Sequence, residues 1–282
     1  MASVPLSDLR ARIAALEGRA GGGVWGRAGE ESRSRSASDA ELRSVRFGLD
    51  IVERLFPLEA RPEGTVHDLA AAGHRDAGAL SGVAVAVLAR MGRAAGPIIW
   101  VCDAVTAGEI GALYGPGLAA FGIDPARLVL VTAKSGADAL WAAEEALSVS
   151  QLAAVVVEIG GASRLLDLTA TRRLALRAER QDTPVFLLRP AGPDTASAAR
   201  TRWRIAPRPS TPDPYGLAGL GRPGFALQLT RNRGGPTGAV DVEFRPYDHR
   251  FRPAHPLPVA APASDRSARP GPAMVIALPR AS

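Results

Sequence analysis

Two glycines, Gly73 and Gly78, have the spacing found in phosphate-binding loops. In such loops, which read G-x-x-x-x-G-K-[ST], backbone amides cradle the phosphates, the lysine contacts the β- and γ-phosphates, and the hydroxyl holds Mg²⁺. Here Ala79 and Leu80 occupy the lysine and hydroxyl positions, and the only lysine of the chain is Lys134. The segment is therefore either a nucleotide site that lacks its chemistry or a strand–turn–helix that packs on a sheet.

Arginines are concentrated in a later part of the chain. Between Arg200 and Arg252 there are ten arginines against four acids. Such an excess attracts phosphates and makes binding salt-dependent. Trp203 lies among them and could stack on a base, but it shares a strand face with Ile205, which favours a place in the core. The arginines are either contacts to DNA or to an acidic partner, or ordinary solvated side chains. The candidate binding residues are Arg200, Arg202, Arg204, Arg231, Asn232 and Arg233.

Other residue types that carry chemistry are scattered. The four histidines lack the spacing of metal ligands, and the chain has no G-x-S-x-G nucleophile elbow. Cys102 lies in an apolar strand pattern typical of a small buried side chain. Glu144 and Glu145 are adjacent on a helix and point in different directions, so they form no carboxylate pair. We expect no catalytic residue, no metal site and no cofactor.

Strand-like and helix-like segments alternate through the middle of the chain. Apolar runs typical of buried strands occupy residues 97–102, 127–132, 152–158 and 184–188. Helical periodicity links the later runs, at residues 138–148 and 168–179. This rhythm implies right-handed crossovers and a doubly wound, mainly parallel sheet. Residues 202–205, 225–230 and 240–244 alternate apolar and polar types, as antiparallel edge strands do. The expected fold class is α/β.

The 282 residues, with a formal net charge of +6, fit one large domain with appendages. We expect an amphipathic helix in residues 1–20, a flexible linker in 21–44, a core domain in 45–252, and a disordered Pro/Ala/Arg-rich tail in 253–282. No apolar run approaches the roughly 20 residues needed to span a bilayer. The N-terminus lacks the apolar region of a signal peptide, and one cysteine excludes internal disulfides. We therefore expect a cytoplasmic protein with no membrane partner.

Several short segments, in this order and spacing, resemble the core of the RecA recombinases. They are FGLD (47–50), GTVH (64–67), the loop between Gly73 and Gly78, IIWVCD (98–103), LVLV (128–131) and VVVE (155–158). A second set resembles more closely the ImuA family, the RecA-like component of bacterial inducible mutagenesis. This set comprises GIDPARL (122–128), DALWAAEE (138–145), LDLTATRR (166–173), ARTRWR (199–204) and LTRNRGG (229–235). The similarity covers roughly residues 45–245.

The resemblance implies a RecA-like fold and a role in translesion synthesis during the SOS response to DNA damage. Family members work beside ImuB, an inactive relative of Y-family polymerases, and an error-prone C-family polymerase. The resemblance places the catalytic carboxylate of RecA near Val105 and the Walker-B position at Glu158. Glu158 is either a surviving acid or a hydrogen-bonded structural residue. Arg231 and Arg233 match a basic pair that reaches the neighbouring subunit's nucleotide in RecA filaments.

These observations favour a pseudo-ATPase, a non-hydrolysing adaptor that bridges an ImuB-like partner to RecA or to DNA. The segments that correspond to the DNA-binding loops of RecA, residues 160–165 and 190–197, are short and contain few basic residues. One alternative is an ATP-binding DNA-repair ATPase with an unusual phosphate loop. A second is a SulA-like inhibitor of cell division, since that family shares a degenerate RecA-like scaffold. The RNRGG segment and the C-terminal extension favour the first hypothesis.

Overall fold

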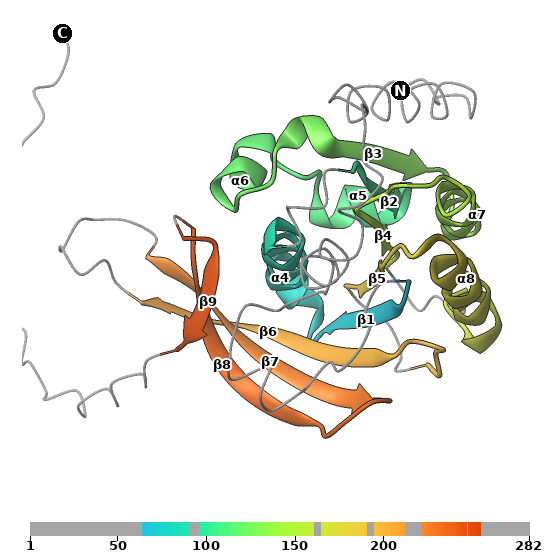
Figure 1. Cartoon of the computed structure of the whole chain (residues 1–282). Helices are drawn as coiled ribbons and strands as arrows, with labels where there is room; N and C mark the ends of the chain where they lie inside the picture. The colour runs from blue at the N-terminus through green and yellow to red at the C-terminus, as the bar shows by residue number, and fades with distance from the viewer. Residues whose placement is uncertain are drawn as a thin grey trace, which may run out of the picture.

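The computed structural model describes residues 64–90, 96–160, 165–190, 195–211, 221–246 and 248–254. Figure 1 labels its elements, which we name accordingly. The helices are α4 (Ala77–Arg90), α5 (Ala104–Ile110), α6 (Gly115–Ala120), α7 (Gly136–Ala146) and α8 (Leu168–Gln181), with 3-10 turns η1 (His74–Asp76) and η2 (Pro125–Arg127). The strands are β1 (Val66–Ala71), β2 (Ile98–Asp103), β3 (Leu128–Ala133), β4 (Ala154–Glu158), β5 (Val185–Arg189), β6 (Thr201–Thr211), β7 (Arg222–Asn232), β8 (Gly238–Arg245) and β9 (Arg250–Pro253).

Three segments named from the sequence lie outside the described residues. They are the expected N-terminal helix in residues 1–20, the linker in 21–44 and the tail after residue 254. The first residues of the expected core domain, 45–63, also lie outside. In the part of the chain that the structure describes, no helix is long and apolar enough to cross a membrane.

All nine strands form one sheet in the order β3-β2-β4-β5-β1-β6-β7-β8-β9. The pairings from β3 through β6 are parallel, and those of β7, β8 and β9 are antiparallel. The predicted α/β fold with a mainly parallel sheet and antiparallel edge strands is confirmed. This architecture is consistent with a RecA-like fold. Strand β6 joins the two parts of the sheet, because it pairs parallel to β1 and antiparallel to β7.

Helices cover both faces of the sheet, as Figure 1 shows for α4 on one side and α7 and α8 on the other. Successive side chains of β2 point to opposite faces of the sheet, so this strand contributes to the apolar layer on each face. Ile98 and Trp100 pack in the layer that includes α4, whereas Ile99 and Val101 pack in the layer beneath α7 and α8. Burial on both faces explains why this strand reads as a continuous apolar run. The predicted doubly wound arrangement is therefore confirmed.

Side-chain caps fix where three helices begin. Asp103 accepts hydrogen bonds from the amides of Val105 and Thr106 at the start of α5. Ser135 accepts from an amide in the first turn of α7, and Asp167 does the same for α8. Such caps stabilise a helix by about 1 kcal/mol because they satisfy amides that have no partner in the first turn. The cap at Ser135 starts α7 two residues before the residue 138 expected from periodicity.

A buried ion cluster joins the central strands. Asp68, in the middle of β1, is fully buried. Its carboxylate accepts a hydrogen bond from Arg189 Nε on β5 at 2.8 Å and from Arg202 Nη2 on β6 at 3.0 Å. The hydroxyl of Ser197 donates a third hydrogen bond, at 3.0 Å. One carboxylate therefore holds together three adjacent strands and the segment that precedes β6.

We predict that Asp68→Asn lowers the free energy of unfolding by about 3–5 kcal/mol, because it leaves two guanidinium groups without their counter-charge in a buried site. Urea denaturation measures this change. The matched control is Asp241→Asn, which removes a half-exposed partner of Arg208 and should cost at most about 1 kcal/mol. Equal costs for the two variants would contradict the role given to Asp68.

Candidate functional site

The two glycines of the phosphate-loop pattern lie at the end of the central strand β1. The chain leaves β1 at Ala71, makes the single 3-10 turn η1, and enters α4 at Ala77. Gly73 has extended backbone angles, and its carbonyl accepts a hydrogen bond from the Asp76 amide at 3.0 Å. Gly78 lies inside the first turn of α4 rather than in the preceding loop. The strand–turn–helix is present, but its connection is one tight turn closed by its own hydrogen bond.

The residues at the lysine and hydroxyl positions pack instead of facing a ligand. Leu80 is fully buried in the layer between α4 and the sheet, and Ala79 packs at the edge of that layer. The Asp76 carboxylate lies over Gly73, so close that a Cβ added there would stand 3.3 Å from Oδ2. A negative charge inside the turn repels phosphates. The connection therefore presents an acid beside Gly73 and two apolar residues, Ala79 and Leu80, after Gly78.

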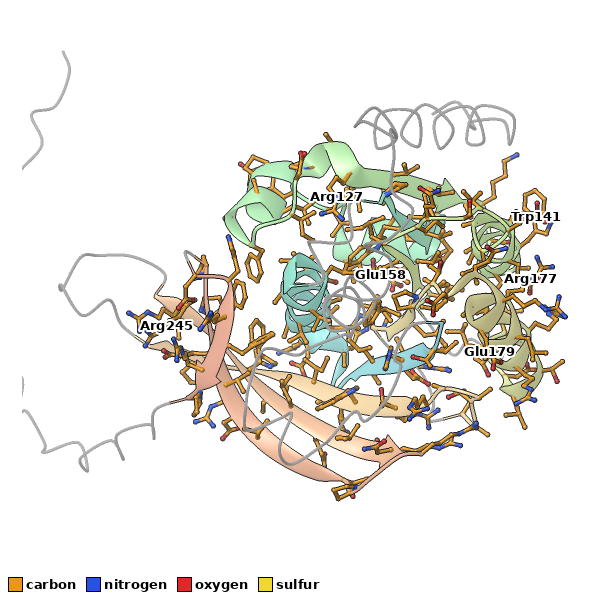
Figure 2. All side chains as sticks on the ribbon, in the orientation of Figure 1. Arg127, Trp141, Glu158, Arg177, Glu179 and Arg245 are labelled. Atoms are coloured by element: carbon orange, nitrogen blue, oxygen red, sulfur yellow. The ribbon has the colours of Figure 1, made fainter. Side chains whose placement is uncertain are left out.

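Glu158, at the end of β4, is held in the core by two hydrogen bonds. Its Oε1 accepts from Ser81 Oγ on α4 at 3.0 Å, and its Oε2 accepts from Trp100 Nε1 on β2 at 2.9 Å. Burial raises the pKa of this carboxyl, the two hydrogen bonds lower it, and the charge of Asp103 raises it further. Figure 2 shows Glu158 in the interior between the strands and α4. These contacts give Glu158 a structural place between α4, β2 and β4.

The position that the resemblance implies for a catalytic carboxylate is occupied by an apolar residue, and the nearby Asp103 is hydrogen-bonded. Val105, near the position of the catalytic carboxylate in RecA, is an exposed apolar residue at the start of α5. The adjacent Asp103 also accepts a hydrogen bond from the Thr106 hydroxyl at 2.6 Å, and that hydroxyl in turn accepts from the Gly160 amide at 2.6 Å. Asp103 thus holds the start of α5 and, through the Thr106 hydroxyl, the backbone at Gly160.

Four of the six candidate binding residues lie near the buried ion cluster that contains Asp68. Arg202 is paired with Asp68, and Arg231 lies opposite Arg202 in the β6–β7 ladder. Arg231 donates to the Ser197 carbonyl at 2.8 Å. The Arg233 amide donates to the Arg200 carbonyl at 3.0 Å, which places these two arginines at the start of β6. The structure therefore brings Arg200, Arg202, Arg231 and Arg233 together, and we call these four residues the arginine cluster.

Like charges act on one another within the arginine cluster. Burial lowers the pKa of Arg231, and the positive charges of Arg233 and Arg202 lower it further. Burial and then the charge of Arg200 lower the pKa of the nearby His67 to about 4. His67 is therefore neutral at pH 7. The arginine cluster concentrates positive charge, and a bound anion would reduce the repulsion between its members.

The remaining two candidates have different surroundings. Arg204 lies on β6 beside the end of β1, where it donates to the Ala72 carbonyl at 3.1 Å. Asn232 holds the turn after β7, donating to the Pro236 carbonyl and accepting from the Gly234 amide. Asn232 thus shapes the turn that carries Arg233. The structure does not bring Arg204 into the arginine cluster.

Part of the arginine excess in β6–β9 is neutralised within the sheet. Arg222 and Arg245 both pair with the buried carboxylate of Glu243, and Figure 2 labels Arg245 on this extension. Arg208 pairs with Asp241, and Arg252 pairs with Asp248. Trp203 is buried in the core, as the strand face that it shares with Ile205 predicted. The arginine cluster, and not the whole extension, is the candidate anion site.

The described residues contain no group of three or more His, Cys, Asp or Glu side chains that could hold a metal ion. Cys102 is buried, as its strand pattern predicted. Sequence reasoning did not identify a pocket between α7 and α8, which Trp141, Leu165 and Arg173 help to line. The sequence gives Trp141 as an apolar residue of a helix, and its exposure becomes visible only in the structure.

No family model matches the chain. Two curated proteins are similar to it, each called Protein ImuA and each from a strain of Caulobacter vibrioides. Both are 34% identical over 220 residues, which cover 73% of this chain and 86% of the relative.

We predict that the pH dependence of stability differs between the natural chain and Glu158→Gln. Since burial raises the folded-state pKa of Glu158, its stabilising contribution is complete below the ordinary carboxyl pKa and is lost as pH rises through the folded pKa. Gln does not titrate, so the variant should gain stability relative to the natural chain above about pH 4.5. Thermal unfolding from pH 4 to pH 8 checks this. A Mg²⁺-dependent stabilisation that Glu158→Gln abolishes would contradict a purely structural role.

Proposed function

We propose a function for this chain from the premise that it belongs to the ImuA family. The chain acts as a non-hydrolysing RecA-like adaptor in error-prone translesion synthesis induced by DNA damage. It bridges an ImuB-like, inactive Y-family polymerase to RecA or to DNA in the cytoplasm. Neither a nucleotide nor a metal takes part, and the chain contributes binding surfaces in place of catalysis.

The observation that carries the proposal is the burial of Leu80 in the core. Hydrolysis of a nucleotide requires a lysine on the phosphates, a hydroxyl on Mg²⁺ and a carboxylate that orients water. Leu80 packs against the sheet, Ala79 offers no charge, and Glu158 is bonded to Ser81 and Trp100. A lysine cannot enter from elsewhere in the loop, because the chain has one lysine, at position 134.

The arginine cluster supports the bridging half of the proposal. It offers positive charge on the strand ends of β6 and β7, where Arg233 is exposed to solvent. Phosphates of single-stranded DNA and carboxylates of an acidic protein surface are the ligands that guanidinium groups bind best. Because Asp68 fixes Arg202 and Ser197 holds Arg231, the cluster is preorganised for such a ligand.

We predict that the protein shows no saturable binding of Mg²⁺-ATP in isothermal titration calorimetry at micromolar concentration. Gly78→Trp provides the control. A Cβ at Gly78 meets nothing within 4 Å, so the chain can accept the substitution, and the bulky side chain then occupies the space beside the turn. Gly108→Trp, at an equally open site on α5, is the matched substitution. Saturable ATP binding that Gly78→Trp abolishes and Gly108→Trp leaves intact would support the ATPase alternative instead.

We predict that Arg233→Ala weakens binding of a single-stranded oligonucleotide and lowers its salt dependence by about 0.7, the slope of one phosphate contact. Fluorescence anisotropy at several salt concentrations measures both quantities. Arg250→Ala, which removes another exposed arginine far along the same sheet extension, is the control. Equal losses for the two variants would show a diffuse attraction to positive charge and would contradict a specific contribution of the arginine cluster.

A further inference from the structure

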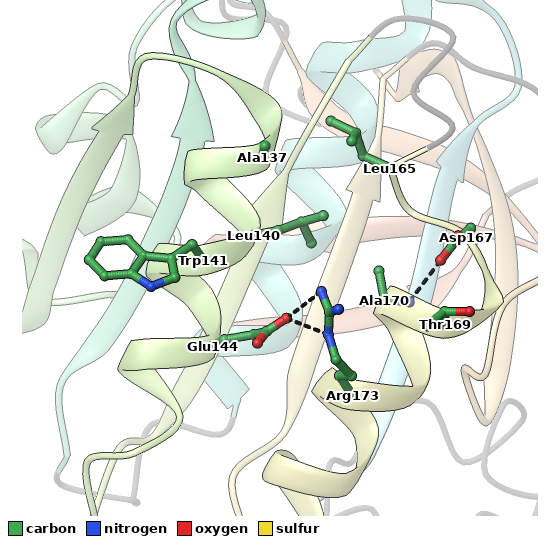
Figure 3. Close-up of a pocket in the computed structure, with 9 residues that line it drawn as sticks. All are labelled: Ala137, Leu140, Trp141, Glu144, Leu165, Asp167, Thr169, Ala170 and Arg173. Carbon is green, nitrogen blue, oxygen red and sulfur yellow. Dashed lines mark hydrogen bonds and ion pairs between the residues drawn. The ribbon is translucent and has the colours of Figure 1, made fainter.

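The two helices on one face of the sheet, α7 and α8, leave a pocket between them (Figure 3). Its volume is about 460 Å³. The residues that line it are Ala137, Leu140, Trp141, Glu144, Leu165, Asp167, Thr169, Ala170 and Arg173. Neither the phosphate-loop region nor the arginine cluster contributes to it. The pocket is therefore a separate feature of the surface.

Large apolar side chains gather around this pocket. Three of the lining residues are large and apolar, namely Leu140, Trp141 and Leu165, and the last two are exposed. Trp141 is 51% exposed and Leu165 is 43% exposed, and they flank the pocket from opposite sides. Exposed apolar patches with a tryptophan are typical of protein–protein contacts, where tryptophan often contributes most of the binding energy.

The charged side chains of the pocket leave its α8 side positive. Glu144 is 12% exposed and is shared by two arginines, with Oε1 2.9 Å from Arg173 Nη2 and Oε2 3.5 Å from Arg177 Nη2. The two arginines keep 57% and 40% of their side-chain surface exposed. Figure 2 shows Arg177 and Trp141 together on this outer side of the molecule.

The acids nearest to the pocket are already engaged. Asp167 caps α8 through the Ala170 amide at 2.7 Å, and Asp138 accepts from the Ser135 hydroxyl at 2.8 Å. Further along α8, Arg180 and Glu179 are both exposed and offset one another. Beside the pocket, Arg173 and Arg177 carry two positive charges against the single carboxylate of Glu144 that they share.

We propose that the pocket between α7 and α8 is the docking site for an acidic amphipathic helix of a partner protein. An apolar side chain of that helix enters between Leu140, Trp141 and Leu165, and carboxylates along its edge pair with Arg173 and Arg177. Helices bind grooves in this way through apolar residues at helical spacing. A second copy of this chain is a poorer occupant, because each copy carries a formal net charge of +6. The assignment stands on the pocket itself and requires neither the arginine cluster nor the absence of nucleotide.

The test uses the full-length chain and two labelled helical peptides. Both peptides carry the same leucine stripe, which is flanked by glutamates in one and by lysines in the other. In fluorescence anisotropy, the glutamate peptide binds, and the lysine peptide binds at least about tenfold more weakly. Trp141→Ala weakens binding of the glutamate peptide by about tenfold or more, as expected for a central tryptophan. Tyr114→Ala, which removes another highly exposed aromatic side chain on a different part of the surface, has no effect.

Two arginine variants test the charge component. Arg173→Glu reverses the preference between the two peptides, whereas Arg173→Gln, which keeps a hydrogen bond to Glu144, reduces binding of the glutamate peptide without reversing the preference. Thermal unfolding shows whether each variant is folded. If Arg173→Glu does not fold, the loss of binding in Arg173→Gln tests the charge component. Equal binding of both peptides, or equal losses in Trp141→Ala and Tyr114→Ala, overturns the proposal. Self-association of the chain that Trp141→Ala abolishes also overturns it, since a second copy would then be the occupant.

Discussion

Asp68 is a charged group in the middle of an apolar sheet, and the arrangement of the surrounding strands depends on it. A buried carboxylate is tolerated only where hydrogen bonds and counter-charges replace its water. Arg189, Arg202 and Ser197 supply them from β5, from β6 and from the segment that leads into β6. Because Arg202 is fixed, its neighbours in the arginine cluster lie at defined positions. The same interaction that stabilises the sheet therefore also shapes the candidate anion site.

The region that holds a nucleotide in related folds contributes packing in this chain. Leu80 fills the layer between α4 and the sheet, and Glu158 links α4 to β2 and β4 through Ser81 and Trp100. These contacts join α4 to the sheet through both apolar packing and hydrogen bonds. A scaffold of this kind is suited to present surfaces. The arginine cluster and the pocket between α7 and α8 offer two such surfaces of different chemistry, one positive and one apolar.

The sequence predicted the parts of the fold that depend on local patterns. Strands β2, β4 and β5 were recognised because burial on both faces produces continuous apolar runs, and their bounds moved by only one or two residues. Helices α5 and α6 were missed, since six or seven residues are too short to show periodicity. The parallel pairing of β6 with β1 and the bonds to Asp68 join residues more than 120 positions apart, a separation at which no pattern within one segment carries information. The exposure of Trp141 was hidden for a related reason, because periodicity marks a residue as apolar but does not say whether another helix covers it.

We propose that this chain assembles with an ImuB-like protein without a nucleotide. The most direct measurement is the affinity of the full-length chain for a purified ImuB-like protein, determined by biolayer interferometry with and without saturating Mg²⁺-ATP. A ligand changes an equilibrium only if it binds one state better than the other. We expect the same dissociation constant in both conditions. An affinity that rises by about tenfold with Mg²⁺-ATP, equivalent to about 1.4 kcal/mol, would contradict it.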